Sequence, residues 1–573
     1  MDLQRTLLIG AIALLSFMLL TEWVNFKDAK TVDQTAQTTR LLDNGNSNGN
    51  SSPALAGLPE LDTPAVQEEL SEDLPTAPEA EQSAAKEPEA EVAPAGRIVQ
   101  VHTDKLQLAI DLNGGDIIEL ALSKHLERLD DPDTPFVLLE QNQTRTYIAQ
   151  SGLIGADGID AKGRALFTTT SDRFELADGE DELVVDLKWR GDNGVEVTKR
   201  ITLRRSDYLI DVDYLVKNGS DARWQANLFG QIKRDGSAAP SADSSGMGMQ
   251  PFLGAAITQP DDRFTKFTFE DMAEEPFKET LPGGWIAMIQ HYFLSAWIPN
   301  PEQSHTYSTR VTSSGYNIAG FTSPALVLDP QQSGKVSARF YAGPKDQYRL
   351  AEISEYLDLS VDYGWLWWIA QPLYWLLSNI YSLVGNWGFT IILLTIVIKA
   401  VFFKLSAASY KSMANMRRVQ PKMASIREEY AEDKQKQSQA MMELYRKEKI
   451  NPMGGCLPIL VQMPVFIALY WVLMESVELR HSPFILWIED LSVMDPYFVL
   501  PIMMGASMFF MQKLNPPPPD PMQAKIMQWL PIIFTFFFLW FPAGLVLYWV
   551  VNNLLSMAQQ YVITKQIEAA DKS

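Results

Sequence analysis

The sequence has little of the residues on which most covalent chemistry depends. Of its 573 residues, one is cysteine, Cys456, and five are histidine. A single cysteine excludes an intramolecular disulfide and any metal site built from cysteines alone. No HExxH, GxxxxGK[ST] or GxSxG pattern is present, so nothing indicates a zinc protease, a P-loop or a hydrolase nucleophile. We therefore expect no enzyme activity, no catalytic residues, no metal and no cofactor.

Charged residues are missing from five stretches, at 6–21, 364–398, 450–474, 496–512 and 526–564. A helix needs about 20 apolar residues to cross a bilayer. The first, third and fourth stretches each predict one span, and the last predicts two, with Phe541-Pro542-Ala543-Gly544 as the turn. In the second stretch, residues 363–384 are rich in Trp and Tyr and are expected to lie in the membrane interface. Residues 387–403 are expected to cross the bilayer. The total is six spans.

The first stretch is consistent with an anchor or with a cleaved signal peptide. Arg5 precedes the apolar run, as it does in both. The residues that follow, Thr21-Glu22-Trp23-Val24, contain no small-x-small cleavage site. We favour an uncleaved anchor.

The distribution of charge predicts the orientation. The Lys404–Lys449 segment carries eleven Lys and Arg residues, whereas the Glu475–Asp495 loop carries five acidic residues and only Arg480. Basic loops stay in the cytoplasm. Both termini are then cytoplasmic, and the region 22–362 lies outside, which is the periplasm if the cell is Gram-negative. Much of the net charge of −22 belongs to this exported region.

The exported region has two parts of different composition. Residues 30–96 are rich in Pro, Ala, Glu, Asn and Ser, which is typical of a disordered acidic linker. From Arg97 onward, short alternating runs such as Leu183–Trp189 are separated by turn signals, with no helical stretch between them. This pattern indicates a β-sandwich. Lys345–Leu359 then predicts a helix that leads to the membrane.

The predicted fold class is a polytopic α-helical membrane protein of six spans with a periplasmic β-sandwich domain. Its segments are an N-terminal transmembrane anchor at 1–29, a linker at 30–96, the β-sandwich domain at 97–344, a connecting and interfacial helix at 345–385, span 2 at 386–404, a cytoplasmic helical hairpin at 405–450, span 3 at 451–478, a periplasmic loop at 479–495, span 4 at 496–512, a cytoplasmic loop at 513–525, span 5 at 526–541, span 6 at 542–564 and a cytoplasmic tail at 565–573.

A sparse set of polar residues falls inside the predicted spans. It consists of Thr395 and Lys399 in span 2, Gln462 in span 3, and Tyr548, Asn552, Ser556 and Gln559 at helical spacing in span 6. An ionisable residue at membrane depth usually faces the bundle interior or water, so Lys399 is a candidate for the fixed charge of a hydrophilic pocket. Alternatively, Lys399 reaches the cytoplasmic surface near Lys404. The span 6 stripe could equally be helix–helix contact.

The Lys404–Lys449 segment predicts two antiparallel helices with a turn near Ala431–Lys434. Its candidate contact residues are Arg417, Arg418, Met423, Arg427, Met441 and Met442. Methionine side chains adapt to varied apolar partners, so they could form a receiving surface. Packing between the two helices is an equally good explanation.

Several motifs carry a resemblance. Asn451–Pro458 (NPMGGCLP), Gln462–Phe466 (QMPVF), Asp520–Gln523 (DPMQ) and Phe541–Trp549 (FPAGLVLYW) are similar to the signature of the YidC/Oxa/Alb family of membrane protein insertases. The first span and the exported domain resemble the Gram-negative form of that family.

The resemblance implies a core of five helices around a hydrophilic groove that is open to the cytoplasm and lipid. Lys399 matches the single positive residue of that groove, where the family commonly has Arg, and Thr395 and Tyr548 match positions that touch the nascent helix. It further implies a hairpin that captures nascent membrane proteins from the ribosome, and an exported domain that contacts the Sec translocon, SecYEG with SecDF. Insertion into the inner membrane, alone or with Sec, would need no nucleotide. A transporter and a passive scaffold are the alternative functions.

Overall fold

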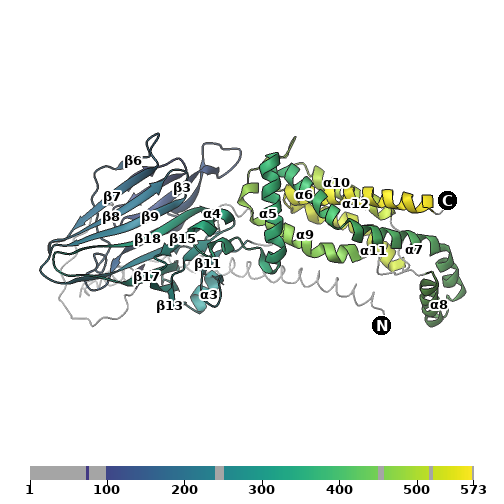
Figure 1. Cartoon of the computed structure of the whole chain (residues 1–573), viewed down its shortest axis with the longest axis horizontal. Coiled ribbons are helices and arrows are strands. Elements are labelled where there is room, and N and C mark those ends of the chain that lie inside the picture. The colour runs from purple at the N-terminus through teal and green to yellow at the C-terminus, as the bar shows by residue number, and fades with distance from the viewer. Residues whose placement is uncertain (1–72, 76–97, 239–250, 449–456, 515–520, 571–573) are drawn as a thin grey trace, which may run out of the picture. The chain divides into compact units, whose positions relative to one another are not determined.

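We describe residues 73–75, 98–238, 251–448, 457–514 and 521–570 of a computed structural model (Figure 1). Strands occupy the N-terminal part of this range, and helices follow from residue 347. The first predicted span, nearly all of the predicted linker and the motif residues 451–456 and 520 lie outside the described residues.

The strands form two sheets. The ten-stranded sheet contains, in spatial order, β13 (Lys278–Pro282), β16 (Ser304–Val311), β17 (Asn317–Leu328), β10 (Trp224–Arg234), β5 (Thr146–Ile154), β4 (Pro135–Gln141), β3 (Asp116–Leu126), β2 (Leu106–Asp111), β1 (Ile98–His102) and β6 (Arg173–Glu175). The eight-stranded sheet contains β12 (Thr265–Phe267), β11 (Gly254–Ile257), β14 (Ile286–Ile289), β15 (Phe293–Pro299), β18 (Ser333–Pro344), β9 (Leu209–Asn218), β8 (Val195–Arg204) and β7 (Glu182–Arg190).

The two sheets share one apolar core. From Val195 to Ile201 of β8, residues alternate between buried and half-buried because successive side chains point to opposite faces of a strand. Every residue of β15 is buried, as expected for a central strand covered on both faces. Buried contacts connect the sheets: the hydroxyls of Tyr147 on β5 and Ser295 on β15 lie 2.7 Å apart, and the Trp297 indole donates to the Gln231 carbonyl at 3.1 Å. The prediction of a domain rich in β-sheet is therefore confirmed.

The expectation of no helix within this domain is wrong at one place. The short helix α3 (Phe269–Glu274) lies between β12 and β13. Thr268 and Asp271 form a capping box, in which each side chain accepts the other's backbone amide hydrogen. This pattern of four residues resembles the turn signals that surround it, so the sequence did not predict a helix here.

The helical part contains, in chain order, α4 (Gln347–Ile353), η1 (Leu357–Ser360), η2 (Gly364–Leu366), α5 (Trp367–Val384), α6 (Trp387–Val401), α7 (Phe403–Glu429), α8 (Lys434–Lys447), α9 (Leu457–Glu475), η4 (Val477–Leu479), α10 (Val499–Leu514), α11 (Pro521–Phe537), η5 (Phe538–Trp540) and α12 (Ala543–Ala570). The η elements are 3₁₀ turns. In Figure 1, α7 and α8 form a hairpin with its turn between Glu429 and Lys434, where the sequence predicts one.

Several helix ends differ from the predicted segments. The helix predicted at Lys345–Leu359 stops at Ile353, because Ser354 is extended, and a 3₁₀ turn follows. The predicted turn at Phe541–Gly544 is shorter than expected, since Phe541 is extended and α12 already begins at Ala543. Helix α12 then continues beyond Thr564, the predicted end of span 6.

Within the described residues, none of the helices is by itself both long and apolar enough to cross a membrane. One bent pair meets the criterion jointly, α6 with α7, with an angle of 67° between them. The bend falls at Phe402, inside the predicted span 2 and near its C-terminal end. The six spans therefore stay a prediction.

Candidate functional site

Lys399 lies near the end of α6 and is 5% exposed. Its Nζ donates a hydrogen bond to Oγ of Ser556 on α12 at 2.7 Å. A longer contact of 3.5 Å joins the same Nζ to Oε1 of Gln462 on α9. Three helices that are distant in sequence therefore converge on one ammonium group.

The partners of Lys399 are held by neighbours of their own. The Gln462 amide donates from Nε2 to Oδ1 of Asn552 at 2.9 Å, and the Ser556 hydroxyl donates to the Asn552 carbonyl at 2.7 Å. Asn552 and Ser556 are four residues apart, so both lie on one face of α12. We name Lys399, Gln462, Asn552 and Ser556 the polar cluster. None of the ion pairs formed among the described residues involves Lys399, so its contacts in the cluster are with uncharged oxygens.

The other two predicted groove residues use their side chains differently. Thr395 is fully buried, and its hydroxyl donates to the Ile391 carbonyl of its own helix at 2.7 Å. Tyr548 is 2% exposed, and its ring stacks on Phe466 with centroids 6.1 Å apart. Thr395 therefore acts locally within α6, while Tyr548 packs α12 against α9 and also forms a side-chain hydrogen bond with Gln462 of the polar cluster.

The structure adds a polar contact that the sequence pattern did not single out. The Asn553 amide donates to Oγ of Ser507 on α10 at 3.0 Å, and both residues are buried. Asn553 follows Asn552 directly, so its side chain points about 100° around the helix, away from the polar cluster. The Asn552-Asn553 pair in a charge-free stretch was the signal for a second polar face.

The hairpin has a small apolar core of its own, to which its methionines contribute. Val419, Met423 and Leu444 form a small buried core, against which Met416, Ile426, Met441 and Tyr445 pack. Met442 points outward and is 55% exposed. Met423 and Met441 therefore pack between the two helices of the hairpin. Of the three candidate methionines, Met442 is the one that is exposed to a partner.

The candidate arginines of the hairpin lie on α7. The Arg417 guanidinium donates to the Leu514 carbonyl at the end of α10, which fixes the base of the hairpin. The Arg427 carbonyl accepts from the Gln437 amide of α8 at 3.3 Å, which joins the two arms. Arg418 belongs to the same helix, α7.

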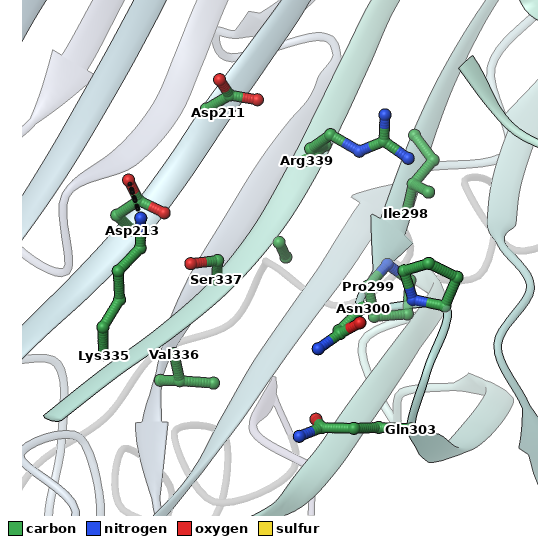
Figure 2. A pocket seen from close by; sticks show the side chains of 12 residues that line it. Asp211, Asp213, Ile298, Pro299, Asn300, Gln303, Lys335, Val336, Ser337 and Arg339 are labelled. Atoms are coloured by element: carbon green, nitrogen blue, oxygen red, sulfur yellow. Dashed lines mark ion pairs between the residues drawn. The ribbon is translucent and has the colours of Figure 1, made fainter. Parts of the chain in front are cut away.

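The β domain contains a hollow of about 500 Å³ between β9, β15 and β18 (Figure 2). The charged groups in its wall are already engaged. Lys335 forms an ion pair with Asp213 at 2.9 Å, Arg204 donates to Asp211, and Arg339 donates to the Ile353 carbonyl at 2.9 Å. The hollow thus offers few free polar groups to a ligand.

Two family models together match residues 98–571 of the chain. The YidC periplasmic domain matches residues 98–376, and the 60Kd inner membrane protein matches residues 373–571. These matches define the class: an inner-membrane protein with a periplasmic domain.

Relatives in other bacteria refine this class. A protein of Cellvibrio japonicus and one of Stutzerimonas stutzeri, each named membrane protein insertase YidC, are both 52% identical to the chain, with all of this chain and all of each relative covered. A crystal structure of an active YidC insertase covers 81% of this chain and 92% of its own, at 20% identity and a TM-score of 0.36. The chain belongs to the YidC family of membrane protein insertases, which are not enzymes in the catalytic sense.

Proposed function

We propose that the polar cluster receives the polar tail of a nascent membrane protein, with Lys399 as the attracting charge in a hydrophilic groove. The observation that carries this proposal is a buried ammonium group whose contacts in the cluster are with uncharged oxygens. A buried charge without a counter-ion is costly and is usually retained for function. An acidic side chain of a substrate would supply the missing counter-charge.

The cluster would lower the barrier for a polar tail to cross. Each unpaired polar group in hydrocarbon costs several kcal/mol. The amide of Gln462, the amide of Asn552 and the hydroxyl of Ser556 can exchange their present hydrogen bonds for bonds to the substrate. Burial of the apolar segment in lipid, at about 25 cal/mol per Å², then drives insertion without nucleotide hydrolysis.

The proposed topology has both termini in the cytoplasm and six spans. One contact supports the placement of the acidic Glu475–Asp495 loop on the same side as the periplasmic domain. Glu475, the last residue of α9, forms a buried ion pair with Lys345, which follows the last strand of that domain. The positive-inside rule then places the basic hairpin opposite, in the cytoplasm.

The remaining partners follow from this orientation. We propose that the hairpin, with Arg417, Arg418, Arg427 and the exposed Met442, meets the ribosome and the emerging chain. Basic side chains attract ribosomal RNA phosphates, and this attraction weakens with salt. The periplasmic domain would contact the Sec translocon, SecYEG with SecDF, when insertion depends on it.

The test compares Lys399→Glu with Lys399→Arg in reconstituted vesicles. The measured quantity is insertion of a substrate whose short exported tail carries Asp or Glu. Lys399→Glu should reduce insertion about tenfold or more, since reversing the charge replaces attraction by repulsion in a low-dielectric site. Lys399→Arg keeps the charge and should retain most of the activity.

A substrate with an uncharged tail provides the internal control. Its insertion should fall much less in Lys399→Glu than that of the acidic tail. Equal insertion of the acidic tail by the wild type and by Lys399→Glu would exclude the charge-attraction role.

A further inference from the structure

A short acidic segment is bound to the β domain by three side chains. The Asp73 carboxylate accepts from Nζ of Lys233 at 2.6 Å. The Asp73 carbonyl accepts from Nε2 of Gln231 at 2.6 Å and from Nη2 of Arg310 at 3.0 Å. The same residue is therefore recognised through its charge and through its backbone.

The donors of this site are also held by hydrogen bonds that do not involve Asp73. The Gln150 amide donates to the buried Asp116 carboxylate at 2.9 Å, which turns its oxygen toward Gln231. Gln231 donates to that oxygen at 2.9 Å from the nitrogen that also reaches Asp73, and Arg310 donates to the Gln231 oxygen at 3.1 Å. This relay fixes both glutamine amides, and fixed donors bind with a smaller loss of entropy.

Strand register brings the same groups together. Gln231 and Lys233 lie two residues apart on β10 and so share one face of the sheet. Lys233 and Arg310 are both paired with Ile318 of the intervening strand β17, and Gln231 is paired with Gly320. A Cβ at Gly320 would lie 2.6 Å from Cβ of Gln231, so the glycine leaves the space that Gln231 needs.

The charged side chains of the site are shielded from water. The Lys233 side chain is 13% exposed, and its Nζ lies 4.3 Å from the centre of the Tyr316 ring. Burial lowers the pKa of Arg310, and the nearby Asp73 raises it. Shielded ion pairs contribute more than exposed ones, because water and salt screen them less.

We propose that strands β5, β10 and β16 carry a binding site for an acidic peptide segment, and that Asp73 of the chain's own linker is its resident occupant. The site binds one side-chain carboxylate and the backbone carbonyl of the same residue. It fixes the acidic linker at one internal point, Asp73. Only the part of the linker before Asp73 then separates the first predicted span from the β domain. The maximum length of that part is roughly a third less than that of the whole linker, because the span of an extended chain scales with its number of residues.

Hydrogen exchange of the full chain in detergent micelles tests the bound state. The reporter is the amide of Leu74, since Pro75 has none. Lys233→Ala and Asp73→Asn should each speed exchange at Leu74 by about tenfold to a hundredfold, because each removes a charge-assisted contact. Lys335→Ala, on the other sheet, and Asp62→Asn, elsewhere in the linker, are the matched controls and should leave it unchanged. Unaltered exchange in β10 shows that each variant is folded.

A charge reversal and a peptide complete the test. Asp73→Lys combined with Lys233→Asp should restore slow exchange, whereas either reversal alone should abolish it. A fluorescent peptide of residues 66–80 should bind the Asp73→Lys chain, whose site is empty, and should bind the double variant at least tenfold more weakly. Wild-type exchange at Leu74 as fast as in the free peptide, or no binding of the peptide to the Asp73→Lys chain, would overturn the proposal.

Discussion

Two buried lysines in this chain have different kinds of hydrogen-bond partner. Lys399 contacts side-chain oxygens that can rotate away, namely those of Ser556 and Gln462. Lys199 on β8 donates to the fixed carbonyls of Gly115 at 2.7 Å and Gly114 at 3.1 Å. These backbone carbonyls belong to the turn between β2 and β3 and cannot leave without rearranging that turn, so Lys199 has a structural role. The adaptable partners of Lys399 suit a site that exchanges them for a substrate.

The first prediction concerns the pH dependence of the β domain. Burial lowers the pKa of Lys199 to about 7, whereas an unfolded lysine has a pKa of 10.5. Between these values the unfolded state binds more protons, so the free energy of unfolding should rise with pH, by at most about 1.4 kcal/mol per pH unit. Urea unfolding followed by the circular dichroism of the strands, between pH 7 and 9, measures this slope.

Lys199→Met is the control for that slope. Methionine keeps the length of the side chain but does not titrate, so the variant should show a flatter dependence on pH, whatever its absolute stability. The same slope in both proteins would assign the effect to another group.

At the scale of the element, the hairpin of α7 and α8 has an inner face that packs the two helices together and an outer face that is accessible to a partner. Its core is small, with Met423 only 4% exposed. Such a core stabilises the hairpin by a few kcal/mol. The base of the hairpin is fixed separately, through Arg417 and Leu514.

Replacing each of two methionines should distinguish these faces. Met423→Ala removes a buried side chain and should destabilise the hairpin by about 2–5 kcal/mol, seen as faster hydrogen exchange in α8. Met442→Ala should leave exchange unchanged but reduce photo-crosslinking of the hairpin to a ribosome-bound nascent chain.

The reverse pattern would contradict this division. If Met442→Ala loosened α8 while Met423→Ala did not, the packing of the hairpin would differ from the one described. If neither altered crosslinking, Met442 would not be a contact of the nascent chain.

At the scale of the whole molecule, the strand-rich and helical parts are joined by buried polar contacts. Lys345 and Glu475 pair with side chains only 3% and 4% exposed. Beside them, Nε2 of His291 lies 2.8 Å from the Met474 carbonyl. These contacts connect residues more than a hundred positions apart in the sequence, so they form only when both parts are folded.

Replacing one partner of this ion pair should destabilise the molecule more than replacing both partners. Lys345→Met alone leaves Glu475 buried without a partner and should cost about 3–5 kcal/mol. Lys345→Met with Glu475→Leu replaces the pair by apolar side chains and should recover most of that loss. Thermal unfolding of the full chain in micelles gives the order of the three proteins.

The exposed pair Arg128–Asp130 serves as the control. Its side chains are 72% and 69% exposed, so Arg128→Ala should change the unfolding temperature little. A double variant less stable than Lys345→Met would show that the buried pair itself stabilises the junction.

Much of the architecture could be predicted without coordinates. Period-two alternation identified the strands, and charge-free stretches identified α6, α9, α10, α11 and α12, because both signals are local. The exact helix ends were less predictable. Ser354 ends α4 early, and Thr268 with Asp271 starts α3, through short contacts that resemble ordinary turn chemistry.

The sequence by itself determined the class of protein, through the segregation of charge and the family motifs, and it singled out Lys399 as an isolated cation in an apolar stretch. Only the tertiary structure decided which groups surround that cation. Gln462 and Ser556 reach it from α9 and α12, and Met423 turns inward while Met442 turns outward. Helical periodicity places residues on a face of one helix, but partners from distant helices depend on how the helices pack. The contact between Asp73 and β10 likewise joins residues about 160 positions apart, and no local pattern encodes it.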